Sequence, residues 1–188
     1  MAMEPRNYDV TLSPQQPINQ LVAVDGIVRF LGTSELKVGP TGVVTFPKNH
    51  QKVLIEGNEG HLVLLPRNSN EVAYWQMCTF KAYNQKLENA KKNPVLTPKQ
   101  KKFVVDTLTG SAIHIELDSQ GRFTLAKNFI DEKLNESREI VLESADSCEG
   151  THSHIKIWAK KDHVAELDNR RKLAEEEMKG VMAGVLDN

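Results

Sequence analysis

The clearest prediction of local structure in this 188-residue sequence comes from Asp118-Ser119-Gln120-Gly121-Arg122-Phe123-Thr124-Leu125-Ala126-Lys127-Asn128. Asp118 to Gly121 predicts a tight turn, because aspartate can accept hydrogen bonds from the backbone that follows it and glycine adopts positive φ without strain. Alternating apolar residues before and after the turn, in 113–117 and 123–125, make the whole stretch a predicted β-hairpin.

Arg122 lies just past the predicted turn, four residues after Asp118. An ion pair between the two side chains would fix the guanidinium and present it to a phosphate or to the edge of a base. The alternative is an ion pair that only stiffens the hairpin, which is worth about 0–1 kcal/mol when it is exposed.

The same pattern occurs 79 residues earlier, in 38–49. Four residue types recur at this offset: Gly42/Gly121, Thr45/Thr124, Lys48/Lys127 and Asn49/Asn128. Each copy continues into a candidate strand and then into an alternating run that ends in a tryptophan, Trp75 or Trp158. The tryptophans are 83 residues apart, which predicts about four extra residues in the second copy, within 144–153. A repeat of this length predicts two similar structural units.

These motifs resemble the MraZ family, bacterial transcriptional regulators of the AbrB-like swapped-hairpin superfamily. That family has two tandem β-rich units, each marked by an Asp-x-x-Gly-Arg turn, and Asp118 and Arg122 match it in the second copy. The resemblance covers about residues 29–171. In the first copy Gly39 and Val43 stand where the family has the aspartate and the arginine, so Arg122 is the only motif arginine left.

The resemblance implies an α+β fold in which two tandem AbrB/MraZ-like β-rich units form a pseudo-two-fold barrel with peripheral helices. We expect an N-terminal extension with a possible extra strand at 1–30 and the first unit at 31–96. The second unit, with its preceding linker helix, is expected at 97–173 and a C-terminal tail at 174–188.

Local patterns predict several elements directly. Asp25-Gly26 predicts a two-residue turn between strands at 21–24 and 27–31. Apolar spacing predicts a helix at 77–92, ended by Pro94, and Thr97-Pro98 predicts the start of another that runs to Gly110. Further elements are expected as a short helix at 129–134, strands at 139–142 and 155–158, and a last helix from Asp162.

Composition indicates a chain with an ordinary core: 39% of the residues are hydrophobic and 6% aromatic. No apolar run approaches the roughly 20 residues that span a bilayer, and the N-terminus lacks a signal-peptide pattern, so we expect a cytoplasmic protein. Cys78 and Cys148 give no disulfide framework.

The net charge of −1 hides an uneven distribution. Residues 36–102 hold 11 basic and 4 acidic residues, a net charge of +7, whereas the flanking segments are acidic. Such a block is typical of a surface that binds a polyanion, or equally of a solvated helix face, because many of the lysines fall in the predicted helices.

The sequence gives little support to catalysis or metal binding. His152 and His154 would share one strand face, but structural zinc usually shows two well-spaced ligand pairs, so we expect no metal site. We find no nucleophile–base pair and no glycine-rich phosphate loop, so we expect neither an enzyme nor a cofactor, and no small-molecule substrate.

The resemblance implies a nucleoid-associated transcriptional regulator that binds double-stranded DNA through the hairpin turns of a ring-like homo-oligomer. The family acts on promoter repeats ahead of the division and cell-wall gene cluster. Arg122 would read bases with Asp118 orienting it, and lysines would contact phosphates, which makes the affinity fall with salt. The phosphate candidates are Lys37, Lys48 and Lys127. The alternative is an MraZ-like oligomeric scaffold or protein-interaction module that has lost DNA binding, which Gly39 and Val43 favour and the basic block opposes.

Overall fold

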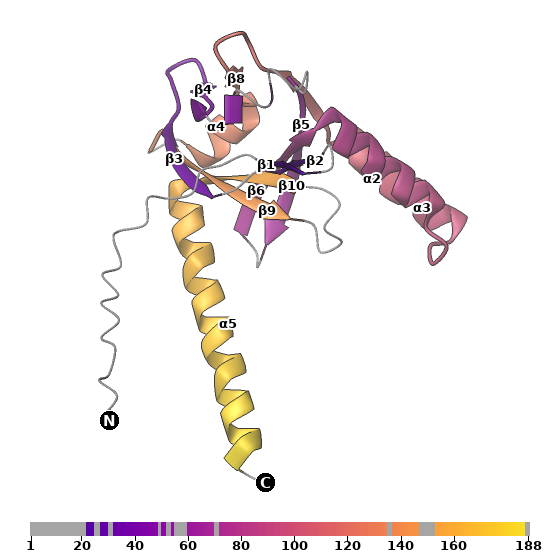
Figure 1. Cartoon of the computed structure of the whole chain (residues 1–188), viewed down its shortest axis with the longest axis vertical. Helices are drawn as coiled ribbons and strands as arrows, with labels where there is room; N and C mark the ends of the chain where they lie inside the picture. Colours follow the sequence, from indigo (N-terminus) through magenta and orange to yellow (C-terminus); the bar gives the residue numbers. More distant parts are fainter. Residues whose placement is uncertain are drawn as a thin grey trace, which may run out of the picture.

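A six-stranded antiparallel sheet occupies the centre of the structure (Figure 1). The computed structural model describes residues 22–24, 27–29, 32–48, 50–51, 54, 60–69, 72–134, 137–146 and 153–186. The strands are β1 (Val22–Val24), β2 (Ile27–Arg29), β3 (Thr33–Lys37), β4 (Val43–Thr45), β5 (His61–Ser69), β6 (Val72–Thr79), β7 (Ile113–Glu116), β8 (Arg122–Thr124), β9 (Glu139–Asp146) and β10 (Ser153–Ala159). The helices are α2 (Phe80–Lys92), α3 (Pro98–Gly110), α4 (Lys127–Lys133) and α5 (Lys160–Leu186).

The strand order of the central sheet reflects the two copies in the sequence. It runs β3-β9-β10-β6-β5-β7, so strands of the first copy and their counterparts in the second lie at equal distances from the middle. At the middle, Gln76 of β6 lies directly opposite Lys156 of β10, which holds the equivalent position in the second copy. The copies therefore form one sheet together rather than two separate sheets.

The α+β fold with mostly antiparallel strands is confirmed. The remaining strands form two small sheets, β1 with β2 and β4 with β8. Among the described residues the three sheets do not close into a barrel, so the expected closed barrel is not observed in that part of the chain.

The expected equivalence of Trp75 and Trp158 is wrong. Trp75 lies in the main core, where its ring meets that of Phe129 with a centroid distance of 6.1 Å. Trp158 packs on the opposite face of the sheet, against Tyr74 and against His163 of α5. Adjacent strand residues point to opposite faces, so matching by residue type alone shifted the alignment by an odd number of positions. Extra residues do occur in the second copy, but fewer than the four expected. The cross-strand partners Leu142 and Ile157 are 15 residues apart, whereas their equivalents in the first copy, Leu64 and Met77, are 13 apart, so the β9–β10 hairpin is two residues longer than the β5–β6 hairpin.

Helix boundaries follow local capping chemistry. Thr97 caps α3, as expected from the sequence, and forms a reciprocal capping box with Gln100 that was not foreseen. The helix expected from residue 77 begins only at Phe80, where the Thr79 hydroxyl accepts a hydrogen bond from the Ala82 backbone N–H. Met77 and Cys78 belong instead to β6, because a buried apolar run fits a strand as well as a helix.

The C-terminal helix α5 is longer than the sequence suggests and projects away from the sheets (Figure 1). Residues expected to form a tail, 174–188, continue the helix as far as Leu186. None of the described helices is both long enough and apolar enough to cross a membrane.

Two cores lie on the two faces of the central sheet. The smaller one lies beneath α2 and consists of Val63, Leu65, Cys78, Ala82 and Tyr83. The larger one fills the space between the sheet, the β4–β8 pair and α4; its fully buried members include Val44, Leu54, Leu62, Leu64, Met77, Ile140 and Ile157. The β4–β8 pair is therefore held against the body by its apolar face.

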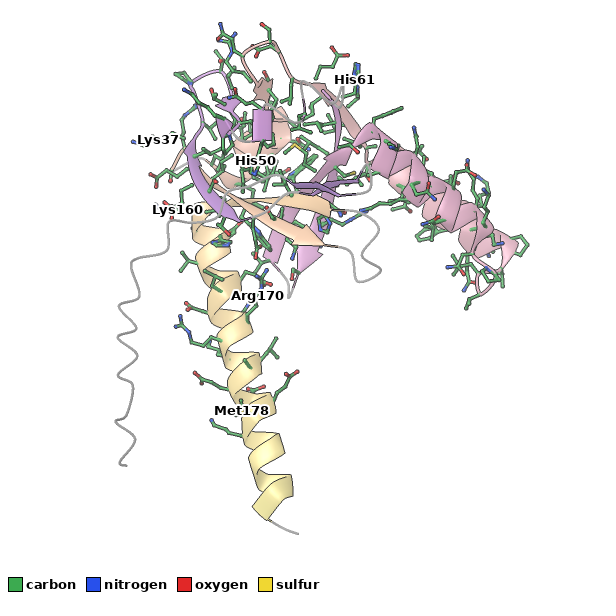
Figure 2. The ribbon with its side chains drawn as sticks, in the orientation of Figure 1. Lys37, His50, His61, Lys160, Arg170 and Met178 are labelled. Carbon is green, nitrogen blue, oxygen red and sulfur yellow. The ribbon has the colours of Figure 1, made fainter. Side chains whose placement is uncertain are left out.

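A buried network of charges anchors α5 to the sheet. Arg170, labelled in Figure 2, donates from Nε to Glu166 at 2.9 Å and from Nη1 to Glu143 at 2.5 Å. Glu143 also accepts a hydrogen bond from the indole N–H of Trp158, and Glu166, only 1% exposed, accepts one from Ser69. The guanidinium of Arg170 thus neutralises two carboxylates that burial would otherwise penalise.

We expect Arg170→Ala to lower the free energy of unfolding by about 2–4 kcal/mol, because it removes the guanidinium that neutralises Glu143 and Glu166 in a poorly solvated place. Urea denaturation followed by circular dichroism measures this change. The neighbouring Arg171→Ala is the matched control, since that side chain is 73% exposed, and it should change stability by less than about 0.5 kcal/mol. Equal effects of the two substitutions would contradict the anchoring role.

The same network predicts a dependence of stability on pH. Burial works against ionisation of Glu143, but the hydrogen bond and charge of Arg170 outweigh it and hold the pKa of Glu143 below its ordinary value of 4.5. A carboxyl with a depressed folded-state pKa stabilises the protein fully above its unfolded-state pKa and loses that contribution as the pH falls through the folded-state pKa. We therefore expect the stability difference between the wild type and Glu143→Gln to shrink as the pH falls from about 6 to about 3. Urea titrations across this range test it, with the exposed Glu175→Gln on α5 as control; a difference that is constant or grows would refute it.

Candidate nucleic-acid interface

The two short strands β4 and β8 form an antiparallel ribbon, one strand from each sequence copy. Val44 lies directly opposite Phe123, its counterpart in the second copy, and both point into the main core. By alternation the neighbouring side chains point outward, and Arg122 and Thr124 are exposed. The ribbon therefore has an apolar inner face and a polar outer face.

The loops that precede the two strands share one hydrogen-bonding pattern. Gly42 and Gly121 both adopt positive φ, 84° and 69°. A carbonyl of each loop also accepts a hydrogen bond from the other copy: the Gly121 oxygen accepts from Phe46 N at 2.9 Å and the Gly42 oxygen accepts from Leu125 N at 3.0 Å. The two predicted turns thus hold each other in place, in addition to closing their own strands.

Asp118 and Arg122 form the expected ion pair. Arg122 Nε donates to Asp118 Oδ2 at 2.7 Å, and Asp118 Oδ1 accepts from the backbone N–H groups of Arg122 and Gln120, both at 2.9 Å. The backbone hydrogen bond from Arg122, joined by the bond from its side chain, holds the pKa of Asp118 below its ordinary value. The carboxylate is therefore charged at neutral pH and fixes both the turn and the guanidinium.

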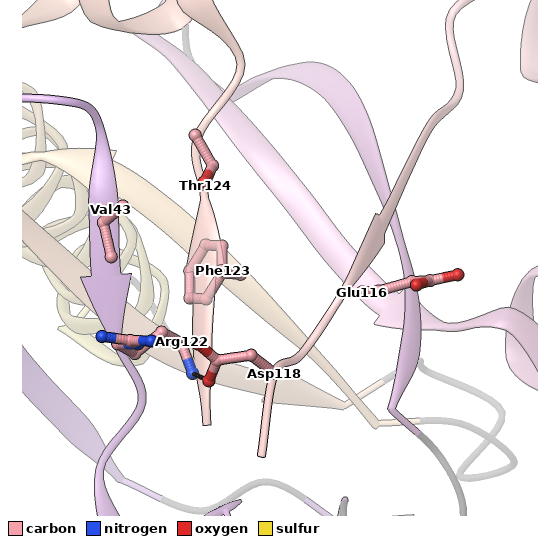
Figure 3. Close-up of a pocket in the computed structure, with 6 residues that line it drawn as sticks. All are labelled: Val43, Glu116, Asp118, Arg122, Phe123 and Thr124. Atoms are coloured by element: carbon pink, nitrogen blue, oxygen red, sulfur yellow. Dashed lines mark hydrogen bonds and ion pairs between the residues drawn. The ribbon is translucent and has the colours of Figure 1, made fainter. Parts of the chain in front are cut away.

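The guanidinium lies on the outer face of the ribbon, where Figure 3 shows it reaching from β8 toward Val43 of β4. Its side chain is 46% exposed. A shallow hollow beside it is lined by Val43, Glu116, Asp118, Arg122, Phe123 and Thr124. Because the ion pair uses Nε, the two terminal amino groups, which form the fork that recognises phosphates and guanine edges, extend beyond it.

The three candidate lysines have different surroundings. Lys127 is the first residue of α4 and Lys48 holds the matching position in the first copy, so each follows the end of its ribbon strand by three residues, and both are exposed. Lys37 ends β3, where it lies opposite Glu139 of β9. Lys48 and Lys127 thus follow the ribbon strands closely, whereas Lys37 has an acidic neighbour in the sheet.

Much of the basic block lies on the α2–α3 arm, which holds seven basic and two acidic residues, and three of these lysines form ion pairs there. Lys91 and Lys92 pair with Glu88, and Lys102 pairs with Asp106. These lysines form the solvated, ion-paired helix faces that were the alternative interpretation of the block. The charge excess of residues 36–102 is therefore not concentrated on the ribbon.

Arg138 supports the first loop of the candidate interface, a role that the sequence did not reveal. Its Nη1 donates to the carbonyl oxygens of Gly39 and Pro40, at 2.8 and 2.9 Å, and its own carbonyl accepts from Val38 N. Arg138 therefore stabilises the first loop, where the aspartate and arginine of the motif are missing. No local pattern could have found it, because 98 or 99 residues separate it from its partners.

The histidines considered for metal binding in the sequence, His152 and His154, give no metal site at the ribbon among the described residues. His152 lies outside the described residues, and His154 is half-buried on β10. Cys148 also lies outside them; Cys78 is buried, and burial raises the pKa of its thiol, which keeps it protonated at neutral pH.

No protein-family model matches the chain, and a search of the curated proteins finds no significant match.

We expect Gly121→Ala to destabilise the protein by about 1–3 kcal/mol. The residue has φ +69°, and an added Cβ would lie 2.3 Å from the Gln51 Cγ atom, so both the backbone and a neighbour resist it. Gly60→Ala is the matched control, because nothing lies within 4 Å of its Cβ position. Thermal and urea denaturation measure the two effects, and a Gly121→Ala protein as stable as the control would show that the turn is not under this constraint.

Proposed function

We propose that this chain is a DNA-binding transcriptional regulator resembling MraZ, and that the β4–β8 ribbon with its two loops is the surface that meets double-stranded DNA. The observation that carries the proposal is the guanidinium of Arg122, oriented by Asp118 on the outer face of a two-stranded ribbon. The major groove of B-DNA admits such a ribbon, and an arginine there can donate two hydrogen bonds to a guanine.

We further propose that the two copies form the pseudo-two-fold, swapped-hairpin arrangement of that superfamily. The exchange of strands in the ribbon and the reciprocal loop bonds support it. Under this arrangement Arg122 and Val43 occupy equivalent positions in the two copies. Each protomer therefore presents one guanidinium to DNA instead of two, because the first copy has valine at this position. Lys48 and Lys127, also equivalent, are the phosphate contacts that set the register.

A single arginine and two lysines make a weak contact, so the proposal includes a homo-oligomer, ring-like as in the family, that engages repeated sites together. Linking several weak contacts raises the overall affinity by effective concentration. An assembly would also offer cover for four exposed apolar side chains of α5. They are Val164, Leu167, Leu173 and Met178.

We expect Arg122→Ala to weaken binding to DNA by about 5- to 150-fold, the equivalent of one lost arginine–guanine contact of about 1–3 kcal/mol. Mobility shifts measure this with a labelled duplex from the region upstream of the protein's own gene, at low and moderate salt. Arg171→Ala is the matched control: it also removes one exposed arginine, from α5, and should bind as the wild type does. Circular dichroism should find both variants folded, because an exposed ion pair contributes about 0–1 kcal/mol.

Two results would count against the proposal. Equal binding by Arg122→Ala and the wild type would remove Arg122 from the mechanism. Failure of the wild type and both variants to bind the duplex, even at low salt, would favour the oligomeric scaffold that has lost DNA recognition, the function that Gly39 and Val43 point to.

A further inference from the structure

Two histidines and a glutamate from distant parts of the sequence converge at one edge of the central sheet. His61 begins β5 and lies directly opposite Glu116 of β7, while His114 precedes Glu116 by two residues and shares its face. Figure 2 shows His61 on the far side of the molecule from α5. The cluster lies on the opposite face from Leu62 and Ile115, which point into the main core and fix the two strands.

We propose that His61, His114 and Glu116 form a binding site for a divalent transition-metal ion. His61 Nδ1 lies 3.2 Å from His114 Nε2 and 3.3 Å from Glu116 Oε1. One ligand atom from each of the three residues lies within 4.8 Å of the others. Among the described residues, these are the ones whose ligand atoms meet as a group of three.

The distances suit a metal ion. Zinc–nitrogen and zinc–oxygen bonds are about 2.0–2.2 Å long, so two ligands of a tetrahedral ion lie about 3.3–3.5 Å apart. The two measured separations are close to that edge length. An ion can therefore bind after the three side chains rotate, without movement of the strands.

The ligand set selects the class of ion. Two imidazoles and one carboxylate suit zinc, cobalt, nickel or copper, whereas magnesium and calcium prefer oxygen ligands alone. All three residues are exposed. Three protein ligands on a surface leave at least one coordination position for water or for a group from a second molecule.

The local packing supports the ligands from one side. The imidazole of His114 meets the ring of Phe80 edge-on, with a centroid distance of 6.0 Å, at the start of α2. The two imidazoles are stacked, with an interplanar angle of 15°. Binding requires the exposed rings to turn so that both nitrogen lone pairs point at the ion, and their exposure on the sheet edge permits this.

The site has a structural consequence that does not depend on DNA binding. Glu116 lies two residues before Asp118, at the base of the loop that carries Arg122. An ion that links β5 to β7 would cross-link the ends of both strands beside that loop. It would also offset the negative charge of Glu116, which lines the hollow beside Arg122.

The test titrates the full-length, tag-free protein with Co²⁺ and follows the visible absorption bands, whose high intensity marks tetrahedral coordination. Zn²⁺ then competes for the same site, and calorimetry gives its affinity. We expect one ion per chain and a loss of at least about tenfold in affinity for each of His61→Gln, His114→Gln and Glu116→Gln. Glu132→Gln, which alters an exposed glutamate of α4, is the matched control and should bind as the wild type does.

Thermal denaturation provides a second measurement. Zn²⁺ should raise the Tm of the wild type and of Glu132→Gln, but not that of the three ligand variants, because an ion bound only to the folded state stabilises it. The side chains of His61 and Glu116 are 59% and 66% exposed, so their variants should fold even if His114→Gln does not.

Two outcomes would overturn the proposal. The first is the absence of saturable Co²⁺ or Zn²⁺ binding to the wild type, which would leave the cluster as a hydrogen-bonded histidine pair with an ion pair. The second is unchanged binding by His61→Gln and Glu116→Gln, which would place the ion elsewhere, for instance at His152 and His154.

Discussion

The pairing of β4 with β8 holds the two copies of the sequence together at the candidate interface. Each strand has only three residues, too few to form a stable hairpin in water alone. They persist because Val44 and Phe123 bury their side chains in the shared core, and because each loop accepts a hydrogen bond from the strand end of the other copy. Neither copy can complete its ribbon without the other, so the duplication is a requirement of the fold and also sets the position of Arg122.

The two halves have kept this backbone arrangement while their side chains have diverged. In the second copy an aspartate inside the loop satisfies two backbone N–H groups and holds an arginine. In the first copy Arg138 satisfies two carbonyl oxygens of the loop from outside. Both solutions meet the same need, since buried or constrained backbone groups must be paired. Only the second also offers a guanidinium on the outer face of the ribbon, which is why we place DNA recognition there.

Charge anchors the rest of the molecule in a similar way. α5 is fixed to the sheet by Arg170 between Glu143 and Glu166, beside the indole of Trp158. Beyond this contact the helix carries exposed apolar residues into solvent. At the β7 edge of the central sheet, His61, His114 and Glu116 collect on β5 and β7 at the base of the Arg122 loop. The potential metal ligands thus lie close to the candidate interface, whereas the anchored helix extends away from the sheets (Figure 1).

The sequence was sufficient for features whose partners are close along the chain. The turn at Asp118, its ion pair with Arg122, the Thr97 cap of α3 and the hairpin of β1 and β2 follow from contacts within a few residues, and such contacts leave a pattern in the sequence. The tandem copies were visible as well, because the same local needs recur in both of them. The opposite faces of Trp75 and Trp158, the role of Arg138 and the meeting of His61 with His114 were not visible. These depend on strand order and register, which bring together residues 53 to 99 positions apart, and a shift of one residue in register moves every side chain to the other face of the sheet.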